Sequence, residues 1–307
     1  MKDEPELVSV ADGVYAWLQP DGTWWLNNAG VVLGDDGVVL VDTCATRRRT
    51  ERFLAEVDTV SGKAPIRFAV NTHLHGDHTY GNALLPADTA VVAHEMTREG
   101  LLADFLLAST PPIWSPTPEW GISAIRAPSV VLRDELTLFT GTRRVELRHP
   151  GYAAHTEGDV VVWLPDERVL FTGDLLFHHI TPLVMAGSID GALRSLDWMA
   201  GFGADTVVPG HGTLIDAADL PDRLAGLERY YRLVADVARD ARAAGLTQLA
   251  AAQACDLGEF ATWPDAERLV PNLHRAYADA TGTRVDQVAA LTEATTWLGG
   301  PLHTDVN

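Results

Sequence analysis

The sequence predicts an α/β protein with layered sheets, and three patterns support that fold class. Short apolar or β-branched runs, each ending in turn residues, fill the first two thirds of the chain. Helical stretches such as 47–61 and 191–201 lie between these runs. After residue 219, apolar residues recur every three or four positions, which is the pattern of one helix face. Strands that alternate with helices are typical of layered sheets covered by helices.

The expected strands follow one another as far as residue 209. They are the runs 13–18, 29–33, 38–41, 66–71, 91–93, 143–147, 159–164, 169–172 and 206–209. The last third is expected to be helical, over 220–241, 246–255, 266–280 and 285–298. We therefore expect one domain over 1–218 and a helical extension over 219–307 that packs on it and carries no chemistry.

Composition and charge argue against several classes of partner. The chain has 307 residues, 47% of them apolar, which is enough for a large buried core. Its 42 acidic and 23 basic residues give a net charge of −19, which repels phosphate backbones and anionic lipid headgroups. The first residues, MKDEPELVSV, have no signal-peptide pattern, and no apolar run approaches the length of a membrane-spanning helix. We expect a cytoplasmic protein that binds neither nucleic acid nor membranes; the sequence makes no prediction of oligomeric state.

The segment NTHLHGDHTYGN, residues 71–82, holds the densest set of candidate metal ligands. These are His73, His75, Asp77 and His78. They follow an expected strand, at the position where functional groups of layered α/β proteins cluster. Gly76 allows the tight turn that brings such side chains together. All four cannot reach one tetrahedral ion without strain, so further ligands are expected from elsewhere in the chain.

Three more candidate ligands stand in matching contexts, each after an apolar strand or a glycine. They are His155 in GYAAHTEGD, Asp174 in VLFTGDLLF and His211 in VVPGHG. Seven ligands in all are enough for two ions that share one carboxylate. Imidazole and carboxylate without thiolate suit zinc, and also iron, manganese or cobalt. Cys44 and Cys255 are far apart and form no CxxC pair, so neither a cysteine-based zinc site nor a disulfide framework is expected.

Together, these motifs resemble those of the metallo-β-lactamase superfamily. The HxHxDH signature stands at His73 to His78, and LVDT ends one residue after the strand-end aspartate, Asp42. The resemblance implies a four-layer αββα sandwich over 1–218 with the metals at one edge. It assigns His73, His75 and His155 to one ion, Asp77, His78 and His211 to the second, and Asp174 to the bridge between them. It also implies that Asp42 hydrogen-bonds and orients a ligand.

Within the superfamily, the chain most resembles cyclases and thioesterases of aromatic polyketide biosynthesis. The similar segments are WWLNNAG, NTHLHGDHTYGN, DVVVWLP, VVPGHG, DLGEF and NLHRAYADA. The resemblance implies two Zn²⁺ ions per chain, which lower the pKa of a bridging water and polarise a carbonyl. The expected reaction is hydrolysis of an acyl bond, above all a thioester, in a small-molecule or carrier-bound substrate. Asp77 is expected to act as a catalytic residue that orients the nucleophile, besides being a ligand.

Two other activities stay open. The first is a β-lactamase or lactonase type of hydrolase. The second is an oxidoreductase like the superfamily's persulfide dioxygenases, with a single iron held by His73, His155 and Asp174.

Several aromatic and histidine side chains are candidates for contact with the substrate. They are Trp24, Trp25, Trp114, Trp120, Tyr152, His178 and His179. The first pair stands in DGTWWLNN and the next pair in the proline-rich segment 109–129. For all four tryptophans, one interpretation is a pinned surface loop and the other an apolar lid over the active site. Either histidine of the FHH motif is a candidate to face the pocket.

Overall fold

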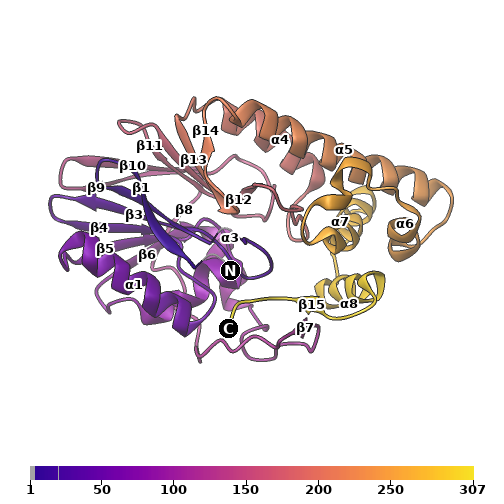
Figure 1. Ribbon diagram of the computed structural model, residues 1–307, viewed down its shortest axis with the longest axis horizontal. Helices are drawn as coiled ribbons and strands as arrows, with labels where there is room; N and C mark the ends of the chain where they lie inside the picture. Colours follow the sequence, from indigo (N-terminus) through magenta and orange to yellow (C-terminus); the bar gives the residue numbers. More distant parts are fainter. Residues whose placement is uncertain (1–3, 20) are drawn as a thin grey trace.

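The computed structural model describes residues 4–19 and 21–307 (Figure 1). Within this part of the chain, one sheet has the strand order β1-β2-β3-β4-β5-β6-β8 and a second the order β14-β13-β12-β11-β10-β9. The strands of the first are β1 (Glu6–Ala11), β2 (Val14–Leu18), β3 (Ala29–Gly34), β4 (Gly37–Val41), β5 (Ile66–Val70), β6 (Ala90–His94) and β8 (Val130–Leu132). Those of the second are β9 (Glu135–Thr140), β10 (Arg143–Arg148), β11 (Val161–Leu164), β12 (Val169–Phe177), β13 (Thr206–His211) and β14 (Ile215–Asp216).

The two sheets pack face to face, and each central strand is apolar on both faces. In β4, Val39 and Val41 belong to the core between the sheets, whereas Val38 and Leu40 belong to the core under a helix. Phe171 of β12 reaches the same intersheet core from the second sheet. A strand buried on both faces has a continuous apolar run rather than an alternating one, as the sequence pattern indicated.

Helices cover the outer face of each sheet (Figure 1). On the first sheet lies α1 (Arg47–Ser61), which Thr46 caps at its start and Gly62 ends in the left-handed conformation. On the second lie α4 (Ile189–Ala200) and α5 (Leu220–Ala243), whose Leu196 and Leu227 share a core with Leu170 of β12. The predicted αββα sandwich is therefore confirmed.

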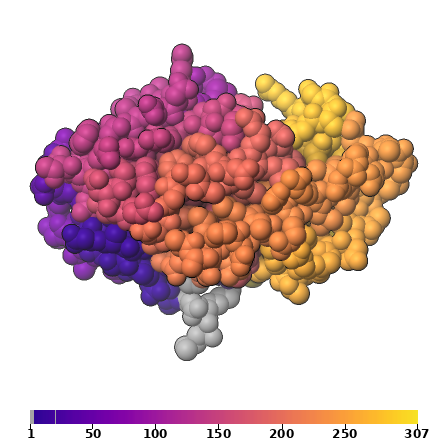
Figure 2. Space-filling view, turned by 90° about the horizontal axis from the view of Figure 1, so that it is seen from above, coloured from indigo at the N-terminus to yellow at the C-terminus, as the bar shows by residue number. Residues whose placement is uncertain are grey.

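The remaining helices divide between the metal-ligand region and the C-terminus. The first group is α2 (Gly76–Thr79), η1 (Tyr80–Leu84) and α3 (Glu95–Leu102). The second is α6 (Gln248–Ala254), η2 (Gly258–Thr262), η3 (Ala266–Arg268), α7 (Leu269–Thr281) and α8 (Gln287–Leu298). The second group forms one end of the molecule, in orange and yellow in Figure 2. Its residues Leu273 and Ala290 share the apolar core of the second sheet, while the division at 218/219 stays a prediction.

The C-terminus returns to the proline-rich segment. There β15 (Leu302–His303) pairs in parallel with β7 (Trp114–Ser115), and Thr304 Oγ1 donates a hydrogen bond to the Trp24 carbonyl. The segment around Trp114 is thus tied down, which favours a pinned loop over a mobile lid. None of the described helices is long and apolar enough to cross a membrane.

Some elements differ from the sequence prediction. The edge strands β1 and β9 were not expected, because half-exposed strands such as ELVSVA and ELTLFT carry polar residues among the apolar ones. Strand β12 was expected to end at residue 172 but continues to Phe177. Its register with β13 is irregular at Gly173, which has φ 51°. Asp174 therefore lies inside a strand at a local distortion rather than after a strand end.

Candidate metal centre

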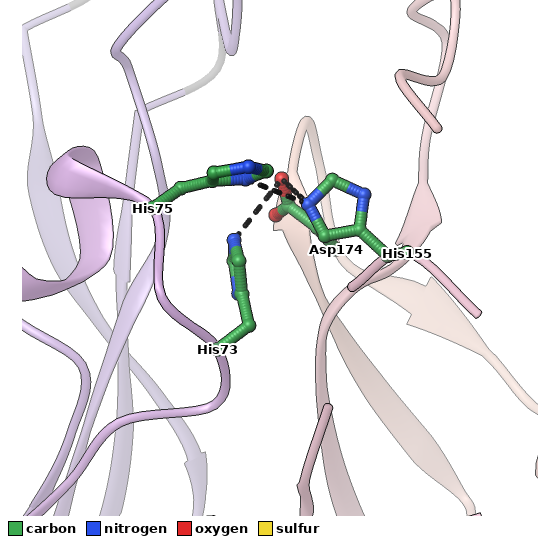
Figure 3. A group of neighbouring side chains, drawn as sticks. All are labelled: His73, His75, His155 and Asp174. Atoms are coloured by element: carbon green, nitrogen blue, oxygen red, sulfur yellow. Dashed lines mark hydrogen bonds and ion pairs between the residues drawn. The ribbon is translucent and has the colours of Figure 1, made fainter. Parts of the chain in front are cut away.

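Four segments bring the seven candidate ligands to one place between the sheets. His73 and His75 follow β5, and the two ligands after them lie in the short helix α2. His155 lies in the loop between β10 and β11, while Asp174 is in β12 and His211 ends β13. Figure 3 shows the side chains from the first half of the sandwich pointing toward those from the second half. The ligand atoms form two groups, within each of which all atoms lie within 4.8 Å of one another.

The first group is His73, His75, His155 and Asp174 (Figure 3). Asp174 Oδ2 lies 3.7 Å from His73 Nε2 and 3.4 Å from His155 Nε2. His155 Nε2 lies 2.9 Å from His75 Nδ1. Ligands about 2.0–2.1 Å from a tetrahedral zinc ion lie roughly 3.3 Å from one another. The spacing of the nitrogens and oxygens is thus that of a metal site.

The second group is Asp77, His78 and His211. Asp77 Oδ2 lies 3.3 Å from His211 Nε2 and 3.8 Å from His78 Nε2. Asp174 reaches this group as well: its Oδ2 is 3.4 Å from His211 Nε2 and its Oδ1 is 3.1 Å from His78 Nε2. Its carboxylate contacts both groups, which is the position that a bridging ligand needs.

Several of these atoms are buried without a hydrogen bond. His73 Nε2, His78 Nε2 and Asp174 Oδ1 have no hydrogen-bond partner among the described residues, because their mutual contacts lack hydrogen-bond geometry. Buried polar atoms almost always have a partner, so an exception requires an explanation. A divalent cation among them satisfies the nitrogen lone pairs and the carboxylate at once, and the residues present fit such ions.

Each histidine that points Nε2 inward holds its other nitrogen in a hydrogen bond. The Nδ1 atom of His155 lies 2.7 Å from the Leu183 carbonyl, and that of His211 lies 2.8 Å from the Gly22 carbonyl. His73 Nδ1 lies 3.0 Å from Thr72 Oγ1. A carbonyl partner holds the proton on Nδ1, which leaves Nε2 free to bind a metal.

Asp42 holds residues of the first histidine segment in place through hydrogen bonds. Its carboxylate accepts hydrogen bonds from Thr72 N at 2.7 Å, Thr72 Oγ1 at 2.8 Å and His78 Nδ1 at 2.8 Å. The residue is 2% exposed, directly follows β4 and has φ 62°. Asp42 thus orients His78 directly and His73 through Thr72.

The electrostatics differ between the two groups. In the first group, burial lowers the pKa of His155 to about 3 and holds the pKa of His73 well below its usual value. These imidazoles are therefore neutral, as ligands must be. In the second group, burial is outweighed by the carboxylates of Asp174 and Asp77, which raise the pKa of His211 to about 9. The excess of buried negative charge there favours cation binding.

A cavity of about 530 Å³ opens beside the metal centre. Its polar end includes His75, Asp77, Asp174 and His211. Its apolar walls include Trp24, Trp25, Trp114, Phe177, Leu183 and Met185. The volume lies in the range of small-molecule sites, and the lining combines a few polar groups with many apolar ones, as such sites do. Three of the four predicted tryptophans thus line the cavity.

The other predicted substrate contacts lie elsewhere. The described residues that line the cavity do not include Trp120, Tyr152, His178 or His179. Trp120 packs behind Trp25, with ring centroids 4.7 Å apart, and the Tyr152 ring lies 3.8 Å from the Arg194 guanidinium. His178 Nδ1 donates to the Thr213 carbonyl, and the His179 ring stacks on that of His178. In the structure these side chains pack against other protein groups and lie outside the cavity lining, and their contact with a substrate stays a prediction.

Residues of the C-terminal extension also line the cavity, although it was expected to carry no chemistry. They are Arg268, Arg284, Val285, Asp286, Gln287, Val288 and Leu291. Helical periodicity predicts which face is apolar but not which part of that face borders a cavity. The residues that reach the cavity come from the end of η3, from the loop between α7 and α8, and from the start of α8.

Comparison with known proteins gives the same fold. A model of the metallo-beta-lactamase superfamily matches residues 22–211. The alpha subunit of 2,4-dinitroanisole O-demethylase from Nocardioides sp. is 26% identical over 219 residues, which cover 68% of this chain and 58% of that protein. Acyl-coenzyme A thioesterase MBLAC2 from Homo sapiens is 26% identical over 211 residues, covering 62% of this chain and 68% of that protein.

A solved structure extends the likeness into the C-terminal helices. The sec-alkylsulfatase Pisa1 from Pseudomonas sp. superposes with a TM-score of 0.72 at 18% identity. The match covers 99% of this chain and 56% of that chain. This chain therefore spans little more than half the length of the demethylase subunit and of the sulfatase.

Proposed function

The chain belongs to the metallo-β-lactamase superfamily, and we propose that it is a dinuclear zinc hydrolase that cleaves the thioester bond of an acyl substrate. The observation that carries this proposal is the pair of ligand groups that share Asp174 at the end of an aromatic cavity. Ligands of imidazole and carboxylate without thiolate suit zinc. Among the relatives, MBLAC2 is named an acyl-coenzyme A thioesterase, which supports an acyl thioester as substrate.

Each part of the site has a distinct task in this proposal. His73, His75 and His155 would hold one ion, and Asp77, His78 and His211 the other, with Asp174 in contact with both groups. Two such ions, when bound, would supply an activated water at neutral pH and polarise the carbonyl of the substrate. Asp77 lines the cavity, where its carboxylate orients the attacking water in addition to holding a metal. Asp42 and Thr72 keep the imidazoles in their binding orientation.

The cavity walls select the acyl group. Trp24 and Trp114 lie edge to face, with ring centroids 6.3 Å apart, and Trp25 packs on Trp114 at 5.2 Å. Rigid aromatic walls exclude water from the reacting bond and favour a bulky apolar acyl group over a small polar one. This preference agrees with the resemblance to polyketide cyclases and thioesterases, whose carrier-bound substrates are large.

A second candidate is an iron-dependent oxidoreductase. The first ligand group is complete without the second, since three imidazoles and a carboxylate lie within 4.8 Å of one another. A site of this kind also accepts a single iron ion.

Metal analysis together with a substrate panel tests these proposals. We expect two zinc ions per purified chain and hydrolysis of aryl or long-chain acyl thioesters, ahead of lactones, esters and β-lactams. A chelator is expected to abolish turnover, and added zinc to restore it. One iron per chain with oxygen uptake on a persulfide would replace the hydrolase by the second candidate. Thioester hydrolysis that survives complete metal removal would overturn both.

A further inference from the structure

A guanidinium group from the C-terminal extension lies at the cavity, near the metal centre. Arg268 ends η3, is 2% exposed and lines the same cavity as His211. Its guanidinium carbon lies 4.5 Å from the centroid of the Trp24 ring and 5.6 Å from that of Phe177. The Phe177 ring in turn stacks on His211 at 5.1 Å with an interplanar angle of 9°. One aromatic ring therefore separates Arg268 from a candidate metal ligand.

Arg268 is held rigidly but is not saturated with hydrogen bonds. Its Nη1 donates to the Thr181 carbonyl at 2.9 Å, and its Nη2 lies 2.7 Å from Asp265 Oδ2. Nε has no hydrogen-bond partner among the described residues. A guanidinium carries five N–H donors, so donors remain after both partners are counted. Because Arg268 is among the residues that line the cavity, these remaining donors are candidates to hydrogen-bond a ligand there.

The neighbouring carboxylates decide what kind of ligand fits. Asp265 pairs with Arg268, and the buried Glu267 accepts a hydrogen bond from Trp24 Nε1 at 2.7 Å. The segment therefore carries two formal negative charges beside one positive charge. An anionic group placed directly beside these two carboxylates meets their repulsion, whereas an uncharged acceptor does not. The local charge favours a neutral oxygen.

We propose that Arg268 determines substrate specificity by donating a hydrogen bond to a neutral carbonyl oxygen carried by an otherwise apolar acyl group. The acyl part of this inference rests on the thioesterase activity proposed above; the recognition of a neutral oxygen does not. The aromatic face of Trp24 holds the guanidinium in place, so little side-chain entropy is lost when the ligand binds.

Binding of two matched naphthalenes to the zinc-loaded protein tests the recognition directly. The probes are 2-acetylnaphthalene and 2-ethylnaphthalene, measured by calorimetry. We expect the ketone to bind about tenfold or more tightly than the hydrocarbon, as one hydrogen bond to a charged donor provides. Equal affinities for ketone and hydrocarbon would overturn the proposal.

Variants then assign the preference to this side chain. Arg268→Met is expected to reduce the ratio of ketone to hydrocarbon affinity to about one. Since this variant removes the ion-pair partner of Asp265, the double variant Asp265→Asn/Arg268→Met is measured as well, and a ratio of about one is expected again. Arg232→Met, on the exposed face of α5, is the control for loss of one arginine and should keep the wild-type ratio. A ketone preference that persists in both Arg268 variants contradicts the assignment.

Turnover separates this inference from the proposed activity. Wild-type enzyme should cleave an acyl thioester with an oxo group in its chain about tenfold faster, in kcat/KM, than the same thioester with methylene at that position. Arg268→Met should remove this difference mainly through the oxo substrate. Absence of thioester cleavage with an intact ketone preference in binding would overturn the proposed function alone. Thioester cleavage with no oxo preference in either assay would overturn the role of Arg268 alone.

Discussion

Replacing Asp42 by asparagine tests how strongly a residue that hydrogen-bonds a metal-ligating histidine affects metal affinity. The carboxylate accepts one bond at Oδ1, from Thr72 N, and two at Oδ2, from Thr72 Oγ1 and His78 Nδ1. An amide has one acceptor oxygen, so either orientation of the new side chain places its NH₂ group against a buried donor. Asparagine also tolerates the left-handed backbone at this position, where φ is 62°. The perturbation is therefore confined to hydrogen bonding and charge.

The size of the effect follows from these contacts. An unsatisfied buried donor costs about 1–3 kcal/mol of folding free energy. Loss of a partner behind a ligating imidazole typically lowers metal affinity by about 10–100-fold. We expect the lower end of that range if the NH₂ group takes the place of Oδ1, because His78 then keeps its acceptor. The upper end is expected if it takes the place of Oδ2.

The assay is zinc affinity by competition with a chelator of known affinity, followed by unfolding in urea with and without zinc. Asp88→Asn, a surface carboxylate in the turn before β6, is the matched control for loss of one negative charge. Zinc affinities of the two variants that agree within about twofold would refute the argument that Asp42 positions His78 and Thr72.

Three further predictions concern other parts of the molecule. Asp174→Ala removes the carboxylate that contacts both ligand groups, so bound metal should fall below two ions per chain and activity by at least about 100-fold, with far-UV circular dichroism unchanged. Gly173→Ala should lower the free energy of unfolding in urea by roughly 2 kcal/mol, because φ is 51° and the new Cβ would lie 2.5 Å from Thr72 Oγ1; an unchanged unfolding midpoint would contradict this. Burial and the neighbouring His149 lower the pKa of His94, so the unfolded chain binds the proton first and stability is lost as pH falls below about 6.5. His94→Asn keeps a cap for α3 and should flatten the dependence of the unfolding midpoint on pH between about 7 and 5; an unaltered slope would show that another group causes it.

The candidate ligands could be predicted because their signals are local. His73, His75, Asp77 and His78 occupy six consecutive positions around a glycine, and the short helix α2 needs only that spacing to orient them. Asp42 and His211 could be placed because each stands at the end of an apolar strand, and strand ends of one sandwich gather at the same edge. Burial of both sheet faces was equally visible, as unbroken runs such as VVLV.

Long-range packing explains why some predicted side chains lie away from the cavity. Trp120 and Tyr152 have the composition of substrate contacts, but each packs on a side chain that local pattern does not identify. Arg268 contacts Trp24 across more than half of the chain, and no periodicity links the two residues. A cavity is what remains after all side chains have packed, so its walls are not a property of any one segment.

The sequence by itself therefore determined the fold class, the identity of the candidate metal ligands and the apolar faces of the helices, because each depends on residue type and spacing within one element. The resemblance already implied that Asp174 bridges the two groups, and only the tertiary structure decided that it does so from inside a distorted strand rather than after a strand end. It also decided that three of four tryptophans line the cavity and that the C-terminal extension contributes to its wall with Arg268, the loop before α8 and the start of α8. These outcomes depend on how elements distant in sequence pack together, which is set by the sum of many side-chain contacts rather than by any local pattern.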